Sequence, residues 1–303
     1  MKQEFYEKLS KIVRKEQILE EEPMKKHTTF RIGGPAEYLI LPQTTEEIAD
    51  VIKLCRQEEI PWYIVGNGSN LLVADEGVRG VVIQLLRNFN QIQVEGCQIR
   101  MQAGAQNAAV AKRALDASLT GFEFAAGIPG TIGGAVVMNA GAYGGEMKDI
   151  LKEVTVLDPN GMIRTIPAEE LELGYRTSII ARKGYVVLEA VIVLKTGDPK
   201  EIKAAMDELK EKRVTKQPLE YPSAGSTFKR PEGYFAGKLI MDAGLRGFSV
   251  GGAQISEKHC GFVINKGNAT AKDVTELMDE TKKIVMEKFG VALEPEVKRL
   301  GQF

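Results

Sequence analysis

Residues 62–70 read Trp-Tyr-Ile-Val-Gly-Asn-Gly-Ser-Asn, an apolar run that passes directly into a glycine-rich loop. The run predicts a buried strand over 62–65, and the consecutive main-chain N–H groups of the loop can form a nest for an anion. Leu71 stands where a Rossmann fingerprint needs its third glycine, and residues 71–73 look extended, not helical. The stretch predicts an anion-binding loop outside a Rossmann fold, with an ordinary Gly-Asn turn as the alternative.

A second glycine-rich stretch begins at Gly127. Of the 31 glycines, eight fall between Gly121 and Gly145 and eight between Gly225 and Gly261. An average chain has about 7% glycine, so both stretches are enriched. In the earlier one glycine recurs without a helical or strand period, as expected where a backbone approaches a flat or phosphorylated ligand closely. Two such loops favour a dinucleotide or flavin site, and tight packing turns inside a core are the alternative.

Composition places the chain among folded globular proteins. Its 303 residues, 44% hydrophobic and 27% charged, are enough for two or three packed domains. Because 40 basic and 41 acidic residues give a net charge of −1, we expect no nucleic-acid partner. An anionic ligand then needs a local cluster of cations, and the basic run between Lys212 and Lys238 is the candidate.

The cysteine and histidine content excludes several kinds of site. The three cysteines are far apart, which argues against a disulfide framework or a thiolate zinc site and favours a reducing compartment. With only two histidines we expect no metal centre. Residues 1–22 are charged throughout, unlike a signal peptide, and the uncharged stretch 124–145 contains a proline and seven glycines. We therefore expect a cytoplasmic protein with no membrane span.

Hydrophobic periodicity and turn residues predict the secondary structure. Helices are expected at residues 5–13, 44–58, 107–119, 198–216, 234–243 and 271–289, and strands at 37–41, 62–65, 78–85, 91–95, 98–102, 153–157, 162–166, 185–194, 261–265 and 291–298. Thr44 with Glu47 predicts a capping box, and Thr270 is expected to cap the last helix. The prolines and small residues of 217–225 predict a domain boundary.

Isolated polar residues are weak signals by themselves. Arg176 can orient a carboxylate through its planar fork, although a lone arginine more often makes a surface contact. Ser226 lies in a turn of small residues, where a capping role is the common one. Glu294 and Glu296 would point to one side of an extended segment, and a solvated edge strand explains them equally well.

Seven ordered segments, taken together, resemble the UDP-N-acetylenolpyruvoylglucosamine reductases from about His27 to the end of the chain. They are residues 27–36 (HTTFRIGGPA), 66–72 (GNGSNLL), 124–130 (FAAGIPG) with 138–144 (MNAGAYG), 174–178 (GYRTS), 222–229 (PSAGSTFK), 251–259 (GGAQISEKH) and 293–297 (LEPEV). Only 50 positions separate Arg176 from Ser226 (226 − 176), which resembles a compact subgroup that lacks an inserted substrate-covering segment.

The resemblance implies an α+β protein. It would have an FAD-binding fold of the vanillyl-alcohol-oxidase (PCMH) type in two subdomains, residues 1–73 and 74–200, and an α+β substrate domain, residues 201–303, whose last strand can return to the first subdomain. Noncovalent FAD would be reduced by NADPH and would pass hydride from N5 to the enolpyruvyl C3 of UDP-N-acetylglucosamine enolpyruvate. Protonation at C2 would give UDP-N-acetylmuramate for peptidoglycan. We expect a monomer.

The resemblance also assigns roles to residues. Ser226 would be the general acid to C2, and Arg176 and Glu296 would stabilise the enolate-like intermediate. The implied cofactor-binding residues are Arg31, Gly66, Asn67, Gly68, Ser69, Asn70, Pro129, Gly130, Gly133, Gly134, Asn139, Gly141 and Ala142. The implied substrate-binding residues are Tyr143, Lys216, Lys229, Arg230, Lys238 and Gln254, and no metal is implied.

Two other functions stay open at this point. A flavoprotein alcohol oxidase or dehydrogenase would share the cofactor fold, but such oxidases often tether flavin through histidine or cysteine, and no histidine lies in either glycine-rich loop. A noncatalytic nucleotide-binding module would be colourless and take up no FAD.

Overall fold

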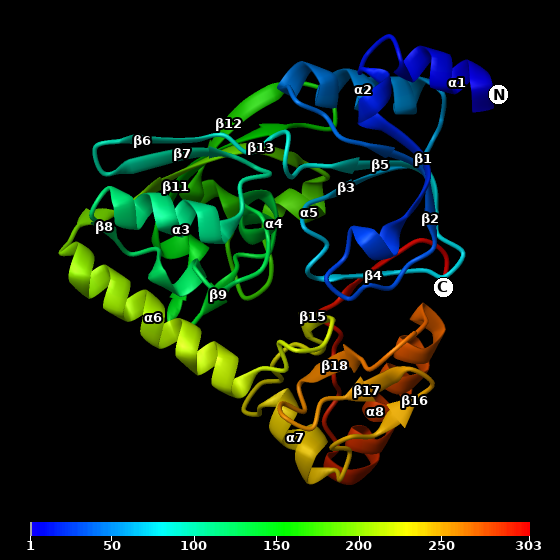
Figure 1. Cartoon of the computed structure of the whole chain (residues 1–303), viewed down its shortest axis with the longest axis vertical. Coiled ribbons are helices and arrows are strands. Elements are labelled where there is room, and N and C mark those ends of the chain that lie inside the picture. Colours follow the sequence, from blue (N-terminus) through cyan, green and yellow to red (C-terminus); the bar gives the residue numbers. More distant parts are fainter. Residues whose placement is uncertain (1) are drawn as a thin grey trace. The chain divides into compact units, whose positions relative to one another are not determined.

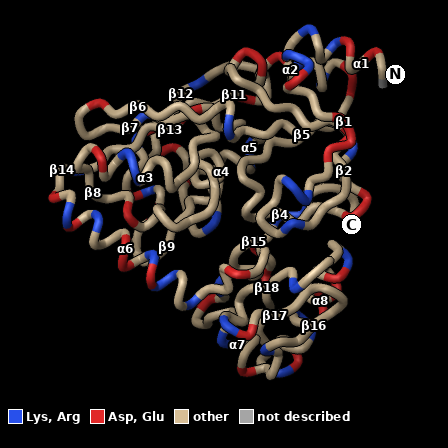
Figure 2. Tube along the Cα trace, viewed as in Figure 1, with Lys and Arg blue, Asp and Glu red and all other residues tan. Residues whose placement is uncertain are grey.

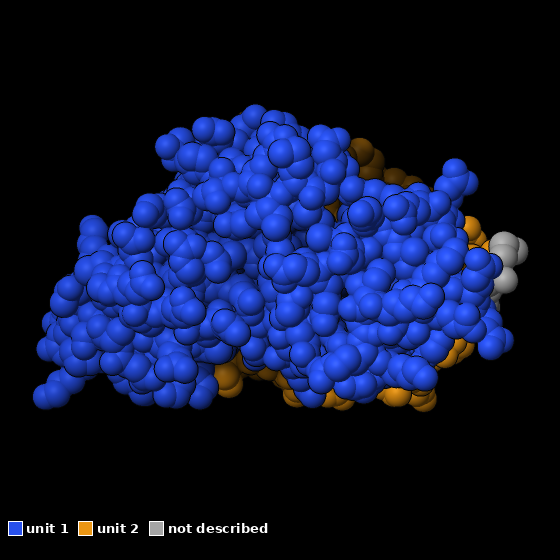
Figure 3. Space-filling view, turned by 90° about the horizontal axis from the view of Figure 1, so that it is seen from above, with its two compact units in different colours: residues 1–19, 39–67, 81–213 blue, residues 20–38, 68–80, 214–303 orange. Residues whose placement is uncertain are grey.

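The computed structural model describes residues 2–303 and divides the chain into two compact units. Unit 1 contains residues 1–19, 39–67 and 81–213, and unit 2 contains residues 20–38, 68–80 and 214–303 (Figure 3). Each unit therefore combines segments that are far apart in the sequence. The division into 1–73, 74–200 and 201–303 stays a prediction.

Unit 1 is built around an antiparallel five-stranded sheet in the order β12-β11-β13-β7-β6 (Figure 1). Its strands are β6 (Ile92–Glu95), β7 (Gln98–Gln102), β11 (Leu151–Leu157), β12 (Ile163–Pro167) and β13 (Val186–Val193). Central β13 is buried along nearly its whole length, and helix α4 (Ile132–Val137) packs against it. The hairpin β11–β12 turns at Asp158, whose carboxylate accepts from Asn160 N at 2.8 Å and Met162 N at 2.9 Å.

A second group of elements begins the chain. It comprises α1 (Lys2–Leu9), β1 (Ile18–Pro23), β2 (Pro35–Ile40), α2 (Thr45–Gln57), β3 (Trp62–Val65) and β5 (Val78–Gln84), with the strand order β1-β2-β5-β3. The pair β3–β5 is parallel, with Trp62 opposite Val81. Thr44 caps α2, because its hydroxyl accepts from Glu47 N at 3.1 Å.

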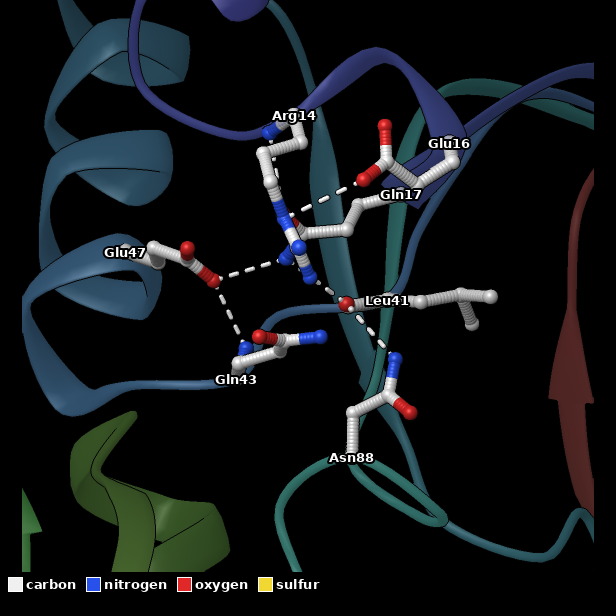
Figure 4. A network of polar contacts seen from close by, with 7 residues as sticks. All are labelled: Arg14, Glu16, Gln17, Leu41, Gln43, Glu47 and Asn88. Carbon is white, nitrogen blue, oxygen red and sulfur yellow. Dashed lines mark hydrogen bonds and ion pairs between the residues drawn. The ribbon is translucent and has the colours of Figure 1, made fainter.

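The capping box predicted at Thr44 is only half formed. The Glu47 carboxylate accepts from Gln43 N at 2.6 Å and from Gln17 Nε2 at 2.8 Å (Figure 4). The Glu47 carboxylate therefore binds the residue before the N-cap and a distant segment, and not the Thr44 main chain as a capping box requires. The sequence could not reveal Gln17 as the competing partner.

Unit 2 contains the four-stranded sheet β15-β18-β17-β16 and two helices. Its elements are β15 (Ser223–Ser226), α7 (Ala236–Asp242), β16 (Ser249–Val250), β17 (Ala253–Ile255), β18 (Phe262–Asn265) and α8 (Ala271–Phe289). The core joins early and late residues, among them Phe30, Leu72, Ile240 and Leu277. Strand β4 (Leu71–Val73) pairs in parallel with β19 (Lys298–Leu300).

The start of α8 has a complete set of hydrogen-bond partners. Thr270 and Asp273 form a capping box, with Thr270 Oγ1 accepting from Asp273 N at 3.0 Å. The Asp75 carboxylate accepts from Ala271 N at 2.7 Å and from Lys272 N at 3.0 Å. The segment that carries β4 is thereby tied to the last helix.

Shorter elements complete the chain. They are α3 (Asn107–Asp116), β8 (Leu119–Thr120), β9 (Gly141–Ala142), β10 (Gly145–Glu146), α5 (Ile179–Lys183), β14 (Lys195–Thr196) and α6 (Pro199–Lys216). Within the described residues, no helix has both the length and the apolar character needed to cross a membrane.

Several predicted elements are wrong or displaced. The strand expected at 291–298 does not form: β19 begins at Lys298, and Pro295 makes only an isolated bridge to Phe228. The helix expected at 107–119 ends at Asp116, because the chain leaves the helix at Ser118, which has a φ of 56°. The first helix covers Lys2–Leu9, not 5–13. Helix α4 forms inside the glycine-rich stretch, where no helical period was found.

Candidate active site

Gly66 is the point where the two glycine-rich loops meet in unit 1. Strand β3 ends at Val65, and a Cβ atom placed on Gly66 would collide with the Thr131 hydroxyl, so a larger residue here would force Thr131 to move. Gln84 fixes the main chain of Gly66, because its Nε2 donates to the Gly66 carbonyl at 3.1 Å. The structure thus brings two of the predicted cofactor segments into contact.

The loop 66–69 has main-chain donors that the protein does not use. Within residues 2–303, no acceptor takes a hydrogen bond from any of its four N–H groups. The carbonyl groups of Gly66, Gly68 and Asn70 all accept hydrogen bonds from the protein. Open donors beside occupied acceptors suit an anion such as a diphosphate.

The second loop, residues 129–134, is held to the start of α3. Asn107 N donates to Gly130 O at 3.1 Å, and the N–H groups of Ile132 and Gly133 donate to carbonyls just before α3, each at 2.8 Å. These three hydrogen bonds fix the loop against the segment that leads into α3. Gly133 and Gly134 lie in the first turn of α4, which begins at Ile132.

Asn139 is fully buried and has a φ of 41°. Its Nδ2 donates to Glu146 Oε2 at 2.7 Å and to Gly174 O at 3.1 Å, and its Oδ1 accepts from Lys148 N at 2.9 Å. The amide is fully committed to the protein. Any contact between Asn139 and FAD therefore has to come from the main chain.

The predicted residues Gly141, Ala142 and Tyr143 form a small hairpin in which β9 pairs with β10. At its turn Tyr143 has a φ of 53° and Gly144 a φ of 92°, the two positive values of a type I′ turn. A tyrosine in the left-handed region is strained, and strained residues cluster at functional sites. The Tyr143 side chain is 48% exposed, so it is available to a ligand.

Arg176 lies against the same hairpin. Its guanidinium donates to Gly141 O at 3.3 Å and lies 5.1 Å from the centroid of the Tyr175 ring. The backbone φ of Arg176 is 56°, and Gly174, two residues earlier, accepts a hydrogen bond from the Asn139 amide. Three non-glycine residues with positive φ, Asn139, Tyr143 and Arg176, therefore belong to one bonded region of unit 1.

Ser226 ends strand β15 in unit 2, where it pairs with Phe262 of β18. Its side chain is exposed, whereas the next residue, Thr227, is buried. Thr227 anchors the strand, since its N donates to Gly261 O at 2.9 Å and its Oγ1 accepts from Val263 N at 2.9 Å. Ser226 therefore presents a hydroxyl from a well-fixed main chain.

Glu296 lies on a segment that runs beside this strand. Its N donates to Thr227 O at 2.9 Å, and Lys229 N donates to Glu294 O at 2.8 Å. Glu296 is half-buried, while Glu294 is exposed and forms an ion pair with Lys229. The structure thus places Ser226 and Glu296 on neighbouring segments of unit 2, and Glu294 in a separate pair.

The predicted cluster of substrate-binding cations is partly neutralised by the protein. Lys229 pairs with Glu294, Lys238 with Asp242 at 2.7 Å, and Lys212 with Glu208 at 2.5 Å. Figure 2 shows acidic and basic residues mixed along α6, which carries the beginning of this run. A charge run in sequence therefore overstates the free positive charge.

The other predicted contacts are more varied. Arg31, with a φ of 55°, and Lys216, at the end of α6, are exposed, and the Arg230 guanidinium lies 4.0 Å from the centroid of the Phe235 ring. Gln254 Nε2 donates to Gly247 O at 3.2 Å, and its buried Oε1 has no partner among residues 2–303. In the same part of the chain, no group of three or more His, Cys, Asp or Glu residues could hold a metal ion.

Arg213 is a candidate that sequence reasoning missed. It is half-buried near the end of α6, and its Cδ would lie 3.2 Å from a Cβ placed on Gly127 of the glycine-rich stretch. Burial lowers the pKa of its guanidinium, and the nearby Tyr143 opposes that shift. Within residues 2–303 no carboxylate pairs with it. In the sequence it is one cation in a charged helix, without any sign of burial.

The comparisons identify the class as an FAD-binding flavoprotein, and the open loop suits the diphosphate of that cofactor. A family model described as "FAD binding domain" matches residues 36–167, and one described as "UDP-N-acetylenolpyruvoylglucosamine reductase, C-terminal domain" matches residues 217–300. The predicted α+β fold with a PCMH-type FAD-binding part is confirmed.

Full-length relatives then give the family. The chain is 55% identical over 300 residues to the UDP-N-acetylenolpyruvoylglucosamine reductase of Lachnoclostridium phytofermentans, covering 98% of this chain and 97% of the relative. The enzyme of that name from Clostridioides difficile is 54% identical, with 99% of each chain covered. The crystal structure of the Thermus caldophilus reductase matches with a TM-score of 0.80 and 40% identity, covering 92% of this chain and 97% of that one. The chain belongs to the UDP-N-acetylenolpyruvoylglucosamine reductase family.

Proposed function

We propose that this chain reduces UDP-N-acetylglucosamine enolpyruvate to UDP-N-acetylmuramate for peptidoglycan synthesis, with NADPH as the reductant. The observation that carries the proposal is the 55% identity, over 98% of the chain, to a reductase named for this substrate. Bound FAD supplies the redox chemistry, because it can accept a hydride from NADPH and deliver one from N5 to the enolpyruvyl C3.

The residues that would hold FAD fit its chemistry. The four open N–H groups of 66–69 suit the diphosphate, and the fixed loop 129–134 would form a side of the cradle. We also propose main-chain contacts from Asn139, Gly141 and Ala142, and a contact from Arg31. The division into two FAD-binding subdomains and a substrate domain belongs to the same proposal.

Three side chains would manage charge and protons on the substrate. Hydride addition at C3 leaves enolate-like charge on the carboxylate and C2, and the Arg176 guanidinium would stabilise it together with Glu296. Ser226 would donate the proton to C2. An ordinary serine is a feeble acid, but a carbanion-like carbon is basic enough to take its proton, and positioned proton transfer typically contributes about 10²- to 10⁴-fold.

Arg213 supports the proposal as an anion contact. The substrate carries a diphosphate, and an arginine already partly desolvated loses less hydration when it pairs with phosphate. We therefore add Arg213 to Lys216, Lys229, Arg230 and Lys238 as candidates for the substrate phosphates, with Tyr143 and Gln254 as further contacts. Lys229 and Lys238 would first have to leave their present carboxylates.

The cellular setting follows from the substrates. NADPH and nucleotide sugars are cytoplasmic metabolites, so we propose a cytoplasmic monomer that acts without nucleic acid or membrane and contributes to cell shape and division. Sedimentation of the purified protein would test the oligomeric state.

The direct test is conversion of the substrate. The purified protein should be yellow, release FAD on denaturation, and convert UDP-N-acetylglucosamine enolpyruvate to UDP-N-acetylmuramate, identified by mass spectrometry, only when NADPH is present. A protein that binds FAD but oxidises an alcohol instead would support the oxidase alternative. A colourless protein that takes up no FAD would contradict both.

A further inference from the structure

Asn70 makes two hydrogen bonds that bracket one buried residue. Its side-chain Nδ2 donates to Glu296 O at 3.1 Å, and its main-chain O accepts from Lys298 N at 2.9 Å. The residue between these partners, Val297, is 5% exposed. Asn70 therefore holds the main chain on both sides of Val297 in unit 2.

These bonds complete a continuous link to the serine. The Glu296 main chain is bound on its other side, where its N donates to Thr227 O at 2.9 Å, and Thr227 directly follows Ser226. The Asn70 side chain holds the Glu296 carbonyl on the side opposite to that main-chain bond. The parallel ladder of β4 with β19 begins one residue later, so Asn70 sits at a fixed end of paired strands.

We infer that Asn70 is a positioning residue for Glu296 and that its side chain is not a ligand of FAD. The inference rests on the role proposed above for Glu296. The amide donates to the Glu296 main chain, whereas the anion-binding donors of the loop are main-chain groups of residues 66–69. Asn70 would thus fix the position of the Glu296 carboxylate, and its own amide would contact neither cofactor nor substrate.

The test separates cofactor binding from the two half-reactions. Asn70→Asp keeps the size of the side chain but removes its donor, and Asn70→Ala removes the amide. FAD affinity, from fluorescence titration, and flavin reduction by NADPH should stay within about threefold of wild type. Reoxidation of the reduced flavin by the enolpyruvyl substrate, followed by rapid mixing, should slow about 10- to 100-fold, since a small misplacement of a reacting group has this cost.

A double-variant cycle gives a readout that a general loss of structure would not move. If Asn70 acts through Glu296, adding Asn70→Asp to Glu296→Gln should slow reoxidation by less than about threefold more. Asn88→Ala is the matched control, because Asn88 Nδ2 also donates to a main-chain carbonyl, that of Leu41, at 3.3 Å (Figure 4). That variant should keep both half-reactions.

Each contrary outcome has a distinct meaning. Weak FAD binding with normal reoxidation in Asn70→Asp, equal slowing of both half-reactions, or multiplicative effects in the double variant would overturn the inference. Normal reoxidation in Glu296→Gln would overturn it too, by removing the role of Glu296. Wild-type reduced flavin that the enolpyruvyl substrate does not reoxidise would instead refute the proposed function.

Discussion

The Arg176 region of unit 1 and the Ser226 region of unit 2 hold their key side chains in different ways. Arg176 sits on a strained backbone with a φ of 56°, next to Tyr143 with the same strain and to Asn139, whose φ is also positive. Ser226 ends a regular strand, and Glu296 lies on a segment bonded to the residue after it. Strain that persists must be enforced by its surroundings. The position of Arg176 therefore depends on the buried Asn139 amide, whereas the positions of Ser226 and Glu296 depend on main-chain hydrogen bonds.

The largest expected effect lies in the region of paired strands. Ser226→Ala should lower kcat by at least about 10²-fold in steady-state assays, because the proposed proton donor is lost. Protein stability should hardly change, since the hydroxyl is exposed. Ser223→Ala, in the same strand, is the control and should keep its activity. Near-normal kcat in Ser226→Ala would remove the hydroxyl from the mechanism.

The strained region should respond almost as strongly in rate. Arg176→Ala removes charge stabilisation of a kind worth roughly 3 to 4 kcal/mol, so kcat should fall about 10²- to 10³-fold. Arg176→Lys keeps the charge but loses the planar fork, so its kcat should lie between those of wild type and Arg176→Ala. Arg182→Ala, which breaks an exposed pair with Glu172, serves as the control. Full activity in Arg176→Ala would refute the assignment.

The strained Arg176 region should depend for its stability on the buried Asn139 amide. Asn139→Ala leaves buried partners unsatisfied, and each such group costs about 1 to 3 kcal/mol, so urea unfolding should show a loss of at least about 2 kcal/mol. Asn160→Ala, in the exposed turn of the β11–β12 hairpin, should stay within about 0.5 kcal/mol. A stable Asn139→Ala protein with normal turnover would mean that the strained loops need no buried support.

The smallest effect concerns pH and belongs to the Ser226 region. His259 Nδ1 accepts from Gly261 N at 3.1 Å, and burial lowers the pKa of this histidine below its usual 6.5. Between the folded pKa and 6.5 the unfolded chain binds more protons, so the free energy of unfolding should decrease as the pH falls through this window. Urea unfolding at several pH values should show a weaker decrease in His259→Gln. An equal decrease in both proteins would exclude His259 as the source.

Much of the fold could be predicted where local chemistry marks both ends of an element. Helix α8 was expected at 271–289 and forms there, because Thr270 caps its start and Gly290, with a φ of 65°, ends it. Strand β3 likewise matches, since an apolar run stops at Gly66. Residues 291–297 resemble a strand in sequence. Proline cannot donate to a ladder, and Pro295 forms only an isolated bridge with Phe228, so no regular strand forms.

The site could be predicted only in part, because its decisive features are long-range. Gly66 was expected in an anion loop, but its approach to Thr131 joins segments 65 positions apart (131 − 66). The pairing of Lys229 with Glu294 removes a cation that the sequence left free. The positive φ of Arg176 has no sign in residue type, unlike that of a glycine.

Rapid mixing of the reduced protein with its substrate tests the central claim, that Ser226 supplies the proton after flavin has been reduced. In wild type, NADPH should bleach the flavin, and UDP-N-acetylglucosamine enolpyruvate should restore its absorbance rapidly, without oxygen. In Ser226→Ala, bleaching should keep its rate while restoration slows at least about 10²-fold. Equal restoration in the two proteins, or slowing of the bleaching step alone, would contradict the account.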